Sequence, residues 1–298
     1  MRRLTYARYS ARKNVQGASG QDILLGKLYG TVLGRMLLSV LVRPSVSNIA
    51  GWLMDRKVSK IAIKPFVKKN AIDMSMCEKS DFDSYNDFFM RKLVDGARPI
   101  SDVRGGFVSP CDSRLTVYSI EDSDRAVFNI KDSEYTLSEL LRDRKLAERY
   151  KGGKLWLFRL CVDDYHRYIY NVDGIQSDVR RINGIYHTVN PIASKYYPIY
   201  KENTRQYCLI KTDDMGTVLV MEVGAMLVGR IENSHMHSCC VQRGSEKGNF
   251  AFGGSTIILL TQKDRVVPLY EIEQKSLRGI ESKVRQGSLV GMKNRLSI

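Results

Sequence analysis

The chain of 298 residues is long enough to bury a hydrophobic core in one large domain or two small ones. Its 43% apolar and 27% charged residues are ordinary globular composition, which argues against a disordered or fibrous protein. Six cysteines in so long a chain, with no signal peptide ahead of them, do not form a disulfide framework, so we expect a reducing, cytosolic environment. The net charge of +15 makes polyanions or an anionic membrane surface candidate partners.

The positive charge is concentrated near the N-terminus. Between Met1 and Asn70 there are fourteen Lys/Arg residues and two acids, a net charge of +12, so the other 228 residues carry only +3. Nucleic-acid-binding domains usually place such charge around stacking aromatic residues or a recognition helix. This segment contains a long apolar stretch instead, so we expect no nucleic-acid partner.

The apolar stretch runs from Ile23 to Val42. Lys27 and Arg35 interrupt it, whereas a membrane-spanning helix needs about 20 apolar residues with few charges. We therefore predict an amphipathic helix lying in the membrane interface, where its cations meet lipid headgroups. A second segment, Ser47–Lys69, mixes apolar residues and lysines in the same way. The alternative is that both segments are ordinary helices packed on the body of the protein.

The rest of the chain is predicted to form a mainly antiparallel β domain. A short helix is expected within Asp83–Lys92, and another should follow Thr136, which forms a capping box with Glu139. The predicted strands are Leu115–Ile120, Leu155–Val162, Tyr207–Lys211, Thr217–Val223, Met226–Ile231 and Ser255–Leu260. We therefore predict an α+β fold, with a basic, helical, membrane-docking segment over residues 1–80 and a sandwich-like β domain over residues 81–298.

Two of the four histidines are candidates for chemistry. His166 lies among acids, a cation and phenols just after a predicted strand, where functional sites are frequent. A lone histidine is more often structural, and His187 fits a turn equally well.

The other two histidines, His235 and His237, are expected on one face of a strand, with Cys239 and Cys240 close behind. This pattern lacks the separated ligand pairs of a structural zinc site. We expect a surface strand there and no metal.

The most distinctive local sequence is Gly-Gly-Ser-Thr at residues 253–256. Glycine allows another group to approach the Gly254 carbonyl closely, and the hydroxyl of Ser255 follows at once. The sequence is not the Gly-x-Ser-x-Gly nucleophile elbow, and it lacks the Gly-Lys-Ser/Thr ending of a phosphate loop. Taken alone, it is typical of a turn that leads into a strand.

Several motifs together resemble the phosphatidylserine decarboxylase family, in the family's order. They are Asn86–Lys92 with Gly96–Ile100, Ser109–Asp112, Asp164–Arg167, Val189–Asn190, Val223–Ala225 with Val228–Gly229, Lys247–Gly248 and Gly254–Thr256. The resemblance extends over roughly Leu28 to Gly291, and the N-terminal layout is similar to the variant of Gram-positive anaerobes such as clostridia.

The resemblance implies a proenzyme that cleaves itself between Gly254 and Ser255. The Ser255 hydroxyl would attack the Gly254 carbonyl, shifting the acyl group from nitrogen to oxygen. Elimination would then leave dehydroalanine, which hydrolyses to a pyruvoyl group and ammonia. This pyruvoyl cofactor would form a Schiff base with the amine of phosphatidylserine and accept the electrons released with carbon dioxide, giving phosphatidylethanolamine.

The family implies an Asp–His–Ser relay for self-cleavage, since a serine hydroxyl needs a base. Asp112 and Ser255 match it, but the usual histidine position is Ile169, which carries no proton. The base is then His166 or another histidine such as His187, or processing is slow or absent. The resemblance also assigns His166 to decarboxylation.

The implied partners are an anionic phospholipid surface and a homodimer of processed chains, with the enzyme peripheral on the cytoplasmic side of the cell membrane. One alternative is a soluble amino-acid decarboxylase on the same fold, which would not need the basic segment. The other is a non-processing homologue that binds membrane surfaces, which Ile169 favours. The basic segment favours the lipid enzyme, because each cation near an anionic bilayer contributes about 1 kcal/mol.

Overall fold

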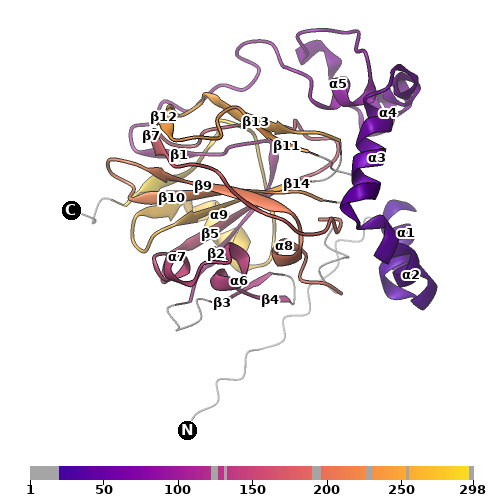
Figure 1. Ribbon diagram of the computed structural model, residues 1–298. Helices are drawn as coiled ribbons and strands as arrows, with labels where there is room; N and C mark the ends of the chain where they lie inside the picture. Colours follow the sequence, from indigo (N-terminus) through magenta and orange to yellow (C-terminus); the bar gives the residue numbers. More distant parts are fainter. Residues whose placement is uncertain are drawn as a thin grey trace.

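The computed structural model describes residues 20–121, 127–130, 133–189, 196–225, 230–252 and 255–294. Its N-terminal helices lie together at one end of a body of β-sheets (Figure 1). They are α1 (Gly20–Gly30), α2 (Val32–Leu41), α3 (Pro44–Met54), the 3-10 helix η1 (Lys57–Ala62), α4 (Ile63–Asn70), the 3-10 helix η2 (Met74–Met76) and α5 (Tyr85–Phe89). Helices at one end of antiparallel sheets confirm the predicted α+β class.

The prediction of one helix from Ile23 to Val42 is wrong, because the segment forms two helices that meet at Thr31. The backbone of Thr31 is extended, and its Oγ1 accepts a hydrogen bond from Gly34 N at 3.0 Å, which caps α2. The two helices are bent by 98° at this break. Within the described ranges no single helix is long and apolar enough to cross a bilayer, and only this bent pair meets the requirement by length and composition.

The described strands form a nine-stranded sheet, two three-stranded sheets and a two-stranded one, and every ladder between them is antiparallel. The large sheet has the order β12-β7-β9-β10-β14-β5-β2-β16, with β8 also paired to β9. The smaller sheets are β11-β13-β6, β1-β17-β15 and β3-β4. The strands are β1 (Gly106–Val108), β2 (Ser113–Ser119), β3 (Val127–Ile130), β4 (Ser133–Thr136), β5 (Lys154–Leu160), β6 (Arg167–Ile169), β7 (Gly174–Gln176), β8 (Arg180–Ile182), β9 (Arg205–Lys211), β10 (Thr217–Val223), β11 (Ile231–Asn233), β12 (Cys239–Val241), β13 (Glu246–Phe250), β14 (Ser255–Thr261), β15 (Val266–Pro268), β16 (Ser282–Val284) and β17 (Leu289–Lys293).

In the described part of the chain, four further helices lie between strands: α6 (Leu137–Leu141), α7 (Arg144–Glu148), α8 (Ile199–Glu202) and α9 (Tyr270–Leu277). The capping box predicted at Thr136 is confirmed at the start of α6, where Thr136 Oγ1 accepts from Glu139 N at 3.3 Å. The helix predicted within Asp83–Lys92 is confirmed as the shorter α5.

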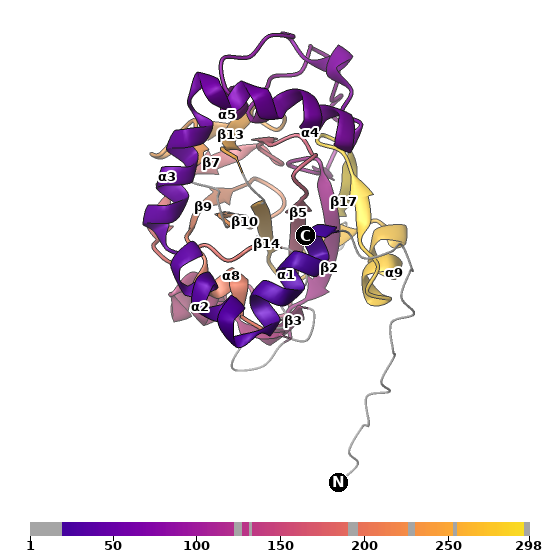
Figure 2. The same ribbon diagram turned by 90° about the vertical axis from the view of Figure 1, so that its right-hand side faces the viewer.

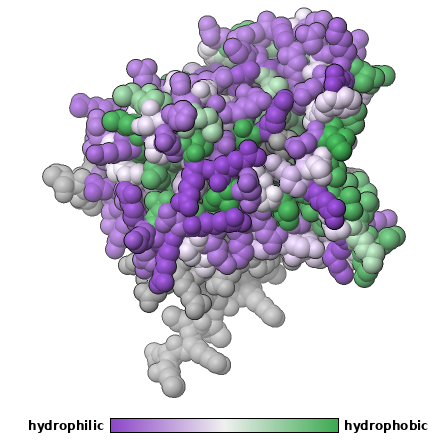
Figure 3. Space-filling view, in the orientation of Figure 1, coloured by the Kyte–Doolittle hydropathy of each residue, from purple (hydrophilic) through white to green (hydrophobic). Residues whose placement is uncertain are grey.

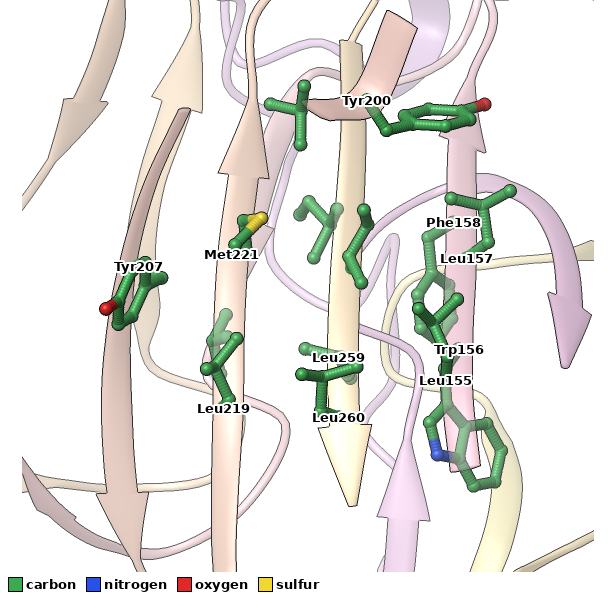
Figure 4. Close-up of a cluster of buried hydrophobic side chains, with 14 of the residues drawn as sticks. Leu155, Trp156, Leu157, Phe158, Tyr200, Tyr207, Leu219, Met221, Leu259 and Leu260 are labelled. Atoms are coloured by element: carbon green, nitrogen blue, oxygen red, sulfur yellow. The ribbon is translucent and has the colours of Figure 1, made fainter. Parts of the chain in front are cut away.

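Five predicted strands are confirmed as neighbours in the middle of the large sheet, namely β9, β10, β14, β5 and β2. The sixth, Met226–Ile231, falls mostly outside the described residues, and Ile231 begins β11. All seven residues of β14 are buried. Figure 4 shows side chains of β5, β9, β10 and β14 packed on one another, among them Leu157, Met221 and Leu260. Strand β14 is therefore held on both edges and in the core.

The helical end surrounds the end of this central strand. Viewed from that side, α1 to α4 form an arc with β14 near its middle (Figure 2). Helix α5 reaches the segment before β14 directly, because Phe252 N donates to Asn86 Oδ1 at 2.9 Å. The fold thus brings the N-terminal helices to the end of β14 where the predicted cleavage position lies.

Candidate active site

Ser255 is the first residue of β14, opposite Leu160 of β5. It is fully buried, and its Oγ has no hydrogen-bond partner among the residues that the structure describes. A buried hydroxyl without a partner costs about 1–3 kcal/mol, so it points to chemistry at this atom rather than to stability. Gly254, the other half of the predicted cleavage site, lies outside the described residues.

His166 lies just before β6 and is also fully buried. Its Nδ1 is 2.9 Å from the carbonyl oxygen of Asp164, and a carbonyl only accepts, so Nδ1 carries the proton. Nε2 has no partner within the described ranges. Burial lowers the pKa of His166 to about 3, and Arg91 contributes in the same direction. At neutral pH the ring is therefore uncharged, with Nε2 free to accept a proton.

The ring of Phe89 in α5 contacts both His166 and the segment before Ser255. The Phe89 ring lies 4.0 Å from the His166 ring, centroid to centroid, and 5.5 Å from the Phe252 ring. The backbone of Phe250 also donates to the His166 carbonyl at 3.0 Å. These contacts bring the histidine to the chain only a few residues before Ser255. The rings also shield this region from water, which strengthens electrostatic interactions there.

Asp112, immediately before β2, is held by Arg98 and by a backbone amide. Arg98 Nε and Nη2 donate to the two carboxylate oxygens at 2.8 and 2.6 Å, and Gln286 N donates to Oδ1 at 2.8 Å. The carboxylate in turn raises the pKa of Arg98. In this geometry neither Asp112 oxygen bonds a histidine among the described residues. Arg98 belongs to the motif Gly96–Ile100, but no spacing rule assigns it to a carboxylate 14 residues away.

Asp112 and Ser255 lie on opposite sides of β5. Arg114 of β2 and Thr256 of β14 both pair with Arg159 of β5, so β2 and β14 flank β5. The strands β2 and β14 are therefore two strand spacings apart, about 10 Å. A direct contact is excluded at that separation. Ile169, at the family's histidine position, donates its backbone N–H to Pro110 O at 2.9 Å beside the Asp112 loop. The position implied by the resemblance is thus next to Asp112, but its side chain cannot transfer a proton.

His187 is buried elsewhere, near the ends of β9 and β10. Its Nδ1 is 3.3 Å from the hydroxyl of Tyr29 in α1, and its Nε2 is 3.3 Å from a Glu202 carboxylate oxygen. Its ring also stacks on Tyr197 at 4.5 Å. Burial lowers its pKa to about 4. Both ring nitrogens therefore have partners, unlike those of His166.

The prediction of a surface strand at His235 and His237 is wrong, because both histidines lie in the exposed connection between β11 and β12. Residues in such a connection do not alternate between two faces, and His237 is 3.7 Å from Asp178. Cys239 and Cys240 do lie in β12. In the part of the chain that the structure describes, no cluster of three or more His, Cys, Asp or Glu residues has the arrangement of a metal site.

The chain is similar to known proteins over most of its length. The phosphatidylserine decarboxylase family model matches residues 85–292. The phosphatidylserine decarboxylase proenzyme 2 of Clostridium acetobutylicum is 46% identical, over 90% of this chain and 91% of that protein. The proenzymes of Ruminiclostridium cellulolyticum and Desulfitobacterium hafniense are 39% and 34% identical, over 96% and 97% of this chain and 96% and 98% of those proteins. With Ser255 and the surrounding motifs inside the matched region, the chain belongs to the phosphatidylserine decarboxylase family.

Proposed function

We propose that this protein is a phosphatidylserine decarboxylase, made as a proenzyme that cleaves itself between Gly254 and Ser255. The relatives are named as proenzymes of this activity. The observation that carries the proposal is the buried hydroxyl of Ser255, which has no partner among the described residues and sits at the start of a central strand. The fold holds this hydroxyl in place, but no described residue forms a hydrogen bond with it. Its oxygen is therefore available for attack, as a self-cleaving serine requires.

In self-cleavage the Ser255 oxygen forms a bond to the Gly254 carbonyl carbon as the peptide C–N bond breaks. The proton of the hydroxyl needs an acceptor, and the amide nitrogen needs a proton as it leaves. We assign the acceptor to His166 Nε2, which is unprotonated at neutral pH and has no partner in the described ranges. Asp112, about two strand spacings away, is paired with Arg98 and does not contact Ser255 directly.

Ser255 also fits the place of a pyruvoyl group. It is fully buried at the start of β14, a strand paired with β5 on one side and with β10 on the other. A pyruvoyl carbonyl there would accept the substrate amine and withdraw the electrons released when carbon dioxide leaves. The carbon that loses the carboxylate must take up a proton, and we assign the relay of this proton to His166 Nε2, which has no partner among the described residues. The ring of Phe89 against His166 keeps water away from this atom.

The N-terminal helices supply a surface for docking on a membrane. Exposed large apolar side chains gather on them: Leu24, Val32, Leu33, Met36, Leu37, Val40, Ile49, Trp52, Leu53, Val58 and Ile61. Apolar surface is visible along the edge of the molecule occupied by these helices (Figure 3). Contiguous exposed apolar surface marks an interaction site, and lysines and arginines on the same helices favour anionic lipid. We propose that this edge lies on the cytoplasmic face of the cell membrane.

Intact mass spectrometry under denaturing conditions tests the proposal. We expect a chain ending at Gly254 and a 44-residue chain that begins at position 255, lighter than its encoded mass by one ammonia. Ser255→Ala should leave one uncut chain of 34.0 kDa. The processed protein, but not the Ser255→Ala variant, should release carbon dioxide from phosphatidylserine vesicles. An uncut wild-type chain without this activity would overturn the proposal.

A further inference from the structure

A polar cavity of about 360 Å³ lies between α3 and the edge of the large sheet formed by β8 and β9. Its lining includes Asn48 of α3, Arg181 of β8, Tyr186, Gln206 of β9 and Arg230. A second cavity of about 260 Å³ shares Asn48 and Arg230 and extends to Phe252, near the start of β14. The two spaces thus connect helix α3 with the segment before Ser255.

Two hydrogen-bond donors at the cavity, on Gln206 and Arg181, have no acceptor recorded among the described residues. Gln206 is buried, and its Nε2 has no partner among the described residues. Arg181 pairs directly with Gln206 across β8 and β9, so both side chains emerge on the same face. No carboxylate in the described ranges lies within ion-pair distance of Arg181. A buried N–H group and a nearby unpaired cation together favour an anionic acceptor.

The residues that line the cavity carry a net positive charge, which also favours an anionic ligand. Among the described lining residues there are three arginines, Arg181, Arg205 and Arg230, and one carboxylate, that of Glu232. Arg205 donates to backbone carbonyls, so Arg181 and Arg230 are the cations available to a ligand. Arg230 is 3.3 Å from Glu232 and 3.3 Å from Asp55, with about half of its side chain exposed. Weak, partly exposed pairs of this kind are readily exchanged for a ligand.

The cavity is within reach of Ser255. Gly224 N donates to Thr204 O at 2.9 Å, and by continuation of the β10–β14 ladder Gly224 lies opposite Ser255. Thr204, which lines the cavity, is therefore two strand spacings, about 10 Å, from Ser255. The Tyr186 ring lies against Gly224, where an added Cβ would meet it at 2.9 Å, and it also lines the cavity.

We propose that Arg181, Arg230 and Gln206 bind the phosphate of a phospholipid headgroup, so that its serine amine reaches position 255. This inference rests on the proposed function. Helix α3 carries the exposed Ile49 and Trp52 as well as Asn48, so a lipid beside α3 would present its headgroup to this cavity. Phosphate is the chemistry that two guanidinium groups and an amide N–H recognise.

Kinetics with Arg181→Gln and Arg230→Gln test the proposal, with the exposed Arg278→Gln of the α9 end as the matched control. Each cavity variant should raise KM for phosphatidylserine in neutral detergent micelles about ten-fold, with kcat nearly unchanged. Glycerophosphoserine, which has no acyl chains, should show the same loss, and this separates headgroup binding from attraction to a membrane. Cleavage should remain complete by intact mass.

Inorganic phosphate serves as the second probe. It should raise the thermal unfolding temperature of the wild-type protein and of Arg278→Gln, but not that of the two cavity variants. If the two cavity variants lose this protection by phosphate but keep the wild-type KM, the site holds free phosphate. That result would overturn the headgroup assignment. If the wild-type enzyme is active and the cavity variants have the same KM as Arg278→Gln, the headgroup assignment is also overturned. The proposed function would then still stand. A wild-type chain without decarboxylation would instead count against the proposed function.

Discussion

The imidazole Nδ1 of His166 lies 2.9 Å from the carbonyl oxygen of Asp164, only two residues earlier in the chain. This short contact fixes the tautomer, because the carbonyl can only accept, and it leaves the lone pair on Nε2. Burial keeps the ring uncharged at neutral pH. We therefore propose His166 Nε2 as the base of self-cleavage, without the Asp–His contact that the resemblance implies, because Asp112 is paired with Arg98.

Replacing His166 should stop self-cleavage. In His166→Gln no unprotonated imidazole is available to accept the Ser255 proton, and general-base catalysis typically contributes about 100-fold or more. We expect processing to slow by at least about that factor, measured as the cleaved fraction over time after cell-free synthesis. The matched variant His187→Gln should still cleave, because both nitrogens of His187 are engaged by Tyr29 and Glu202. The opposite pattern would assign the base to His187.

The buried His166 should make stability fall in acid. Its pKa is about 3 in the folded protein and about 6.5 when unfolded, so below pH 6.5 the unfolded chain binds a proton that the folded chain does not. The free energy of unfolding should drop by about 1.4 kcal/mol per pH unit from this group between about pH 6 and pH 4. Urea unfolding of the uncut Ser255→Ala chain at several pH values measures it.

In the same background, His166→Gln should reduce this pH slope, whereas the exposed His235→Gln should leave it unchanged. Equal slopes in all three chains would show that His166 is protonated in the folded state.

Breaking the Arg98–Asp112 pair should destabilise the fold. Both side chains are mostly buried, and the pair is bidentate. Removing one partner leaves a buried charge, which costs about 3 kcal/mol or more. We expect Arg98→Met to lose about this much in urea unfolding of the Ser255→Ala chain. Adding Asp112→Asn should recover part of the loss, since the unpaired carboxylate is then neutral. Strictly additive losses in this double-mutant cycle would rule out the pairing.

The strands of the core could be predicted from the sequence, because short apolar runs between turn residues, such as Leu155–Val162, are typical of buried strands. Ser255 was assigned only through the family resemblance, because Gly-Gly-Ser-Thr alone is typical of a turn that leads into a strand. Contacts between distant residues could not be predicted. Asn86 with Phe252 and Arg98 with Asp112 depend on how separate elements pack, which no local period encodes. The break at Thr31 was missed because a single cap competes with a long apolar pattern.

Charges on the apolar face of α2 should abolish membrane docking. Leu33 and Leu37 are four residues apart on one face of α2, and they are 79% and 56% exposed. Transfer of a leucine side chain from water to an apolar phase is worth about 1.5–3 kcal/mol, so each loss should weaken binding about ten-fold or more. A glutamate adds repulsion from anionic lipid.

Flotation with vesicles of phosphatidylserine and phosphatidylcholine should therefore recover wild-type protein but not Leu33→Glu/Leu37→Glu. Val267→Glu, at an exposed position of β15, is the matched control and should float normally. Both variants should still cleave at Gly254–Ser255, and the α2 variant should still act on glycerophosphoserine, because Ser255 and His166 lie outside α2. If the α2 variant floats like the wild type, the exposed face of this helix is not the docking surface.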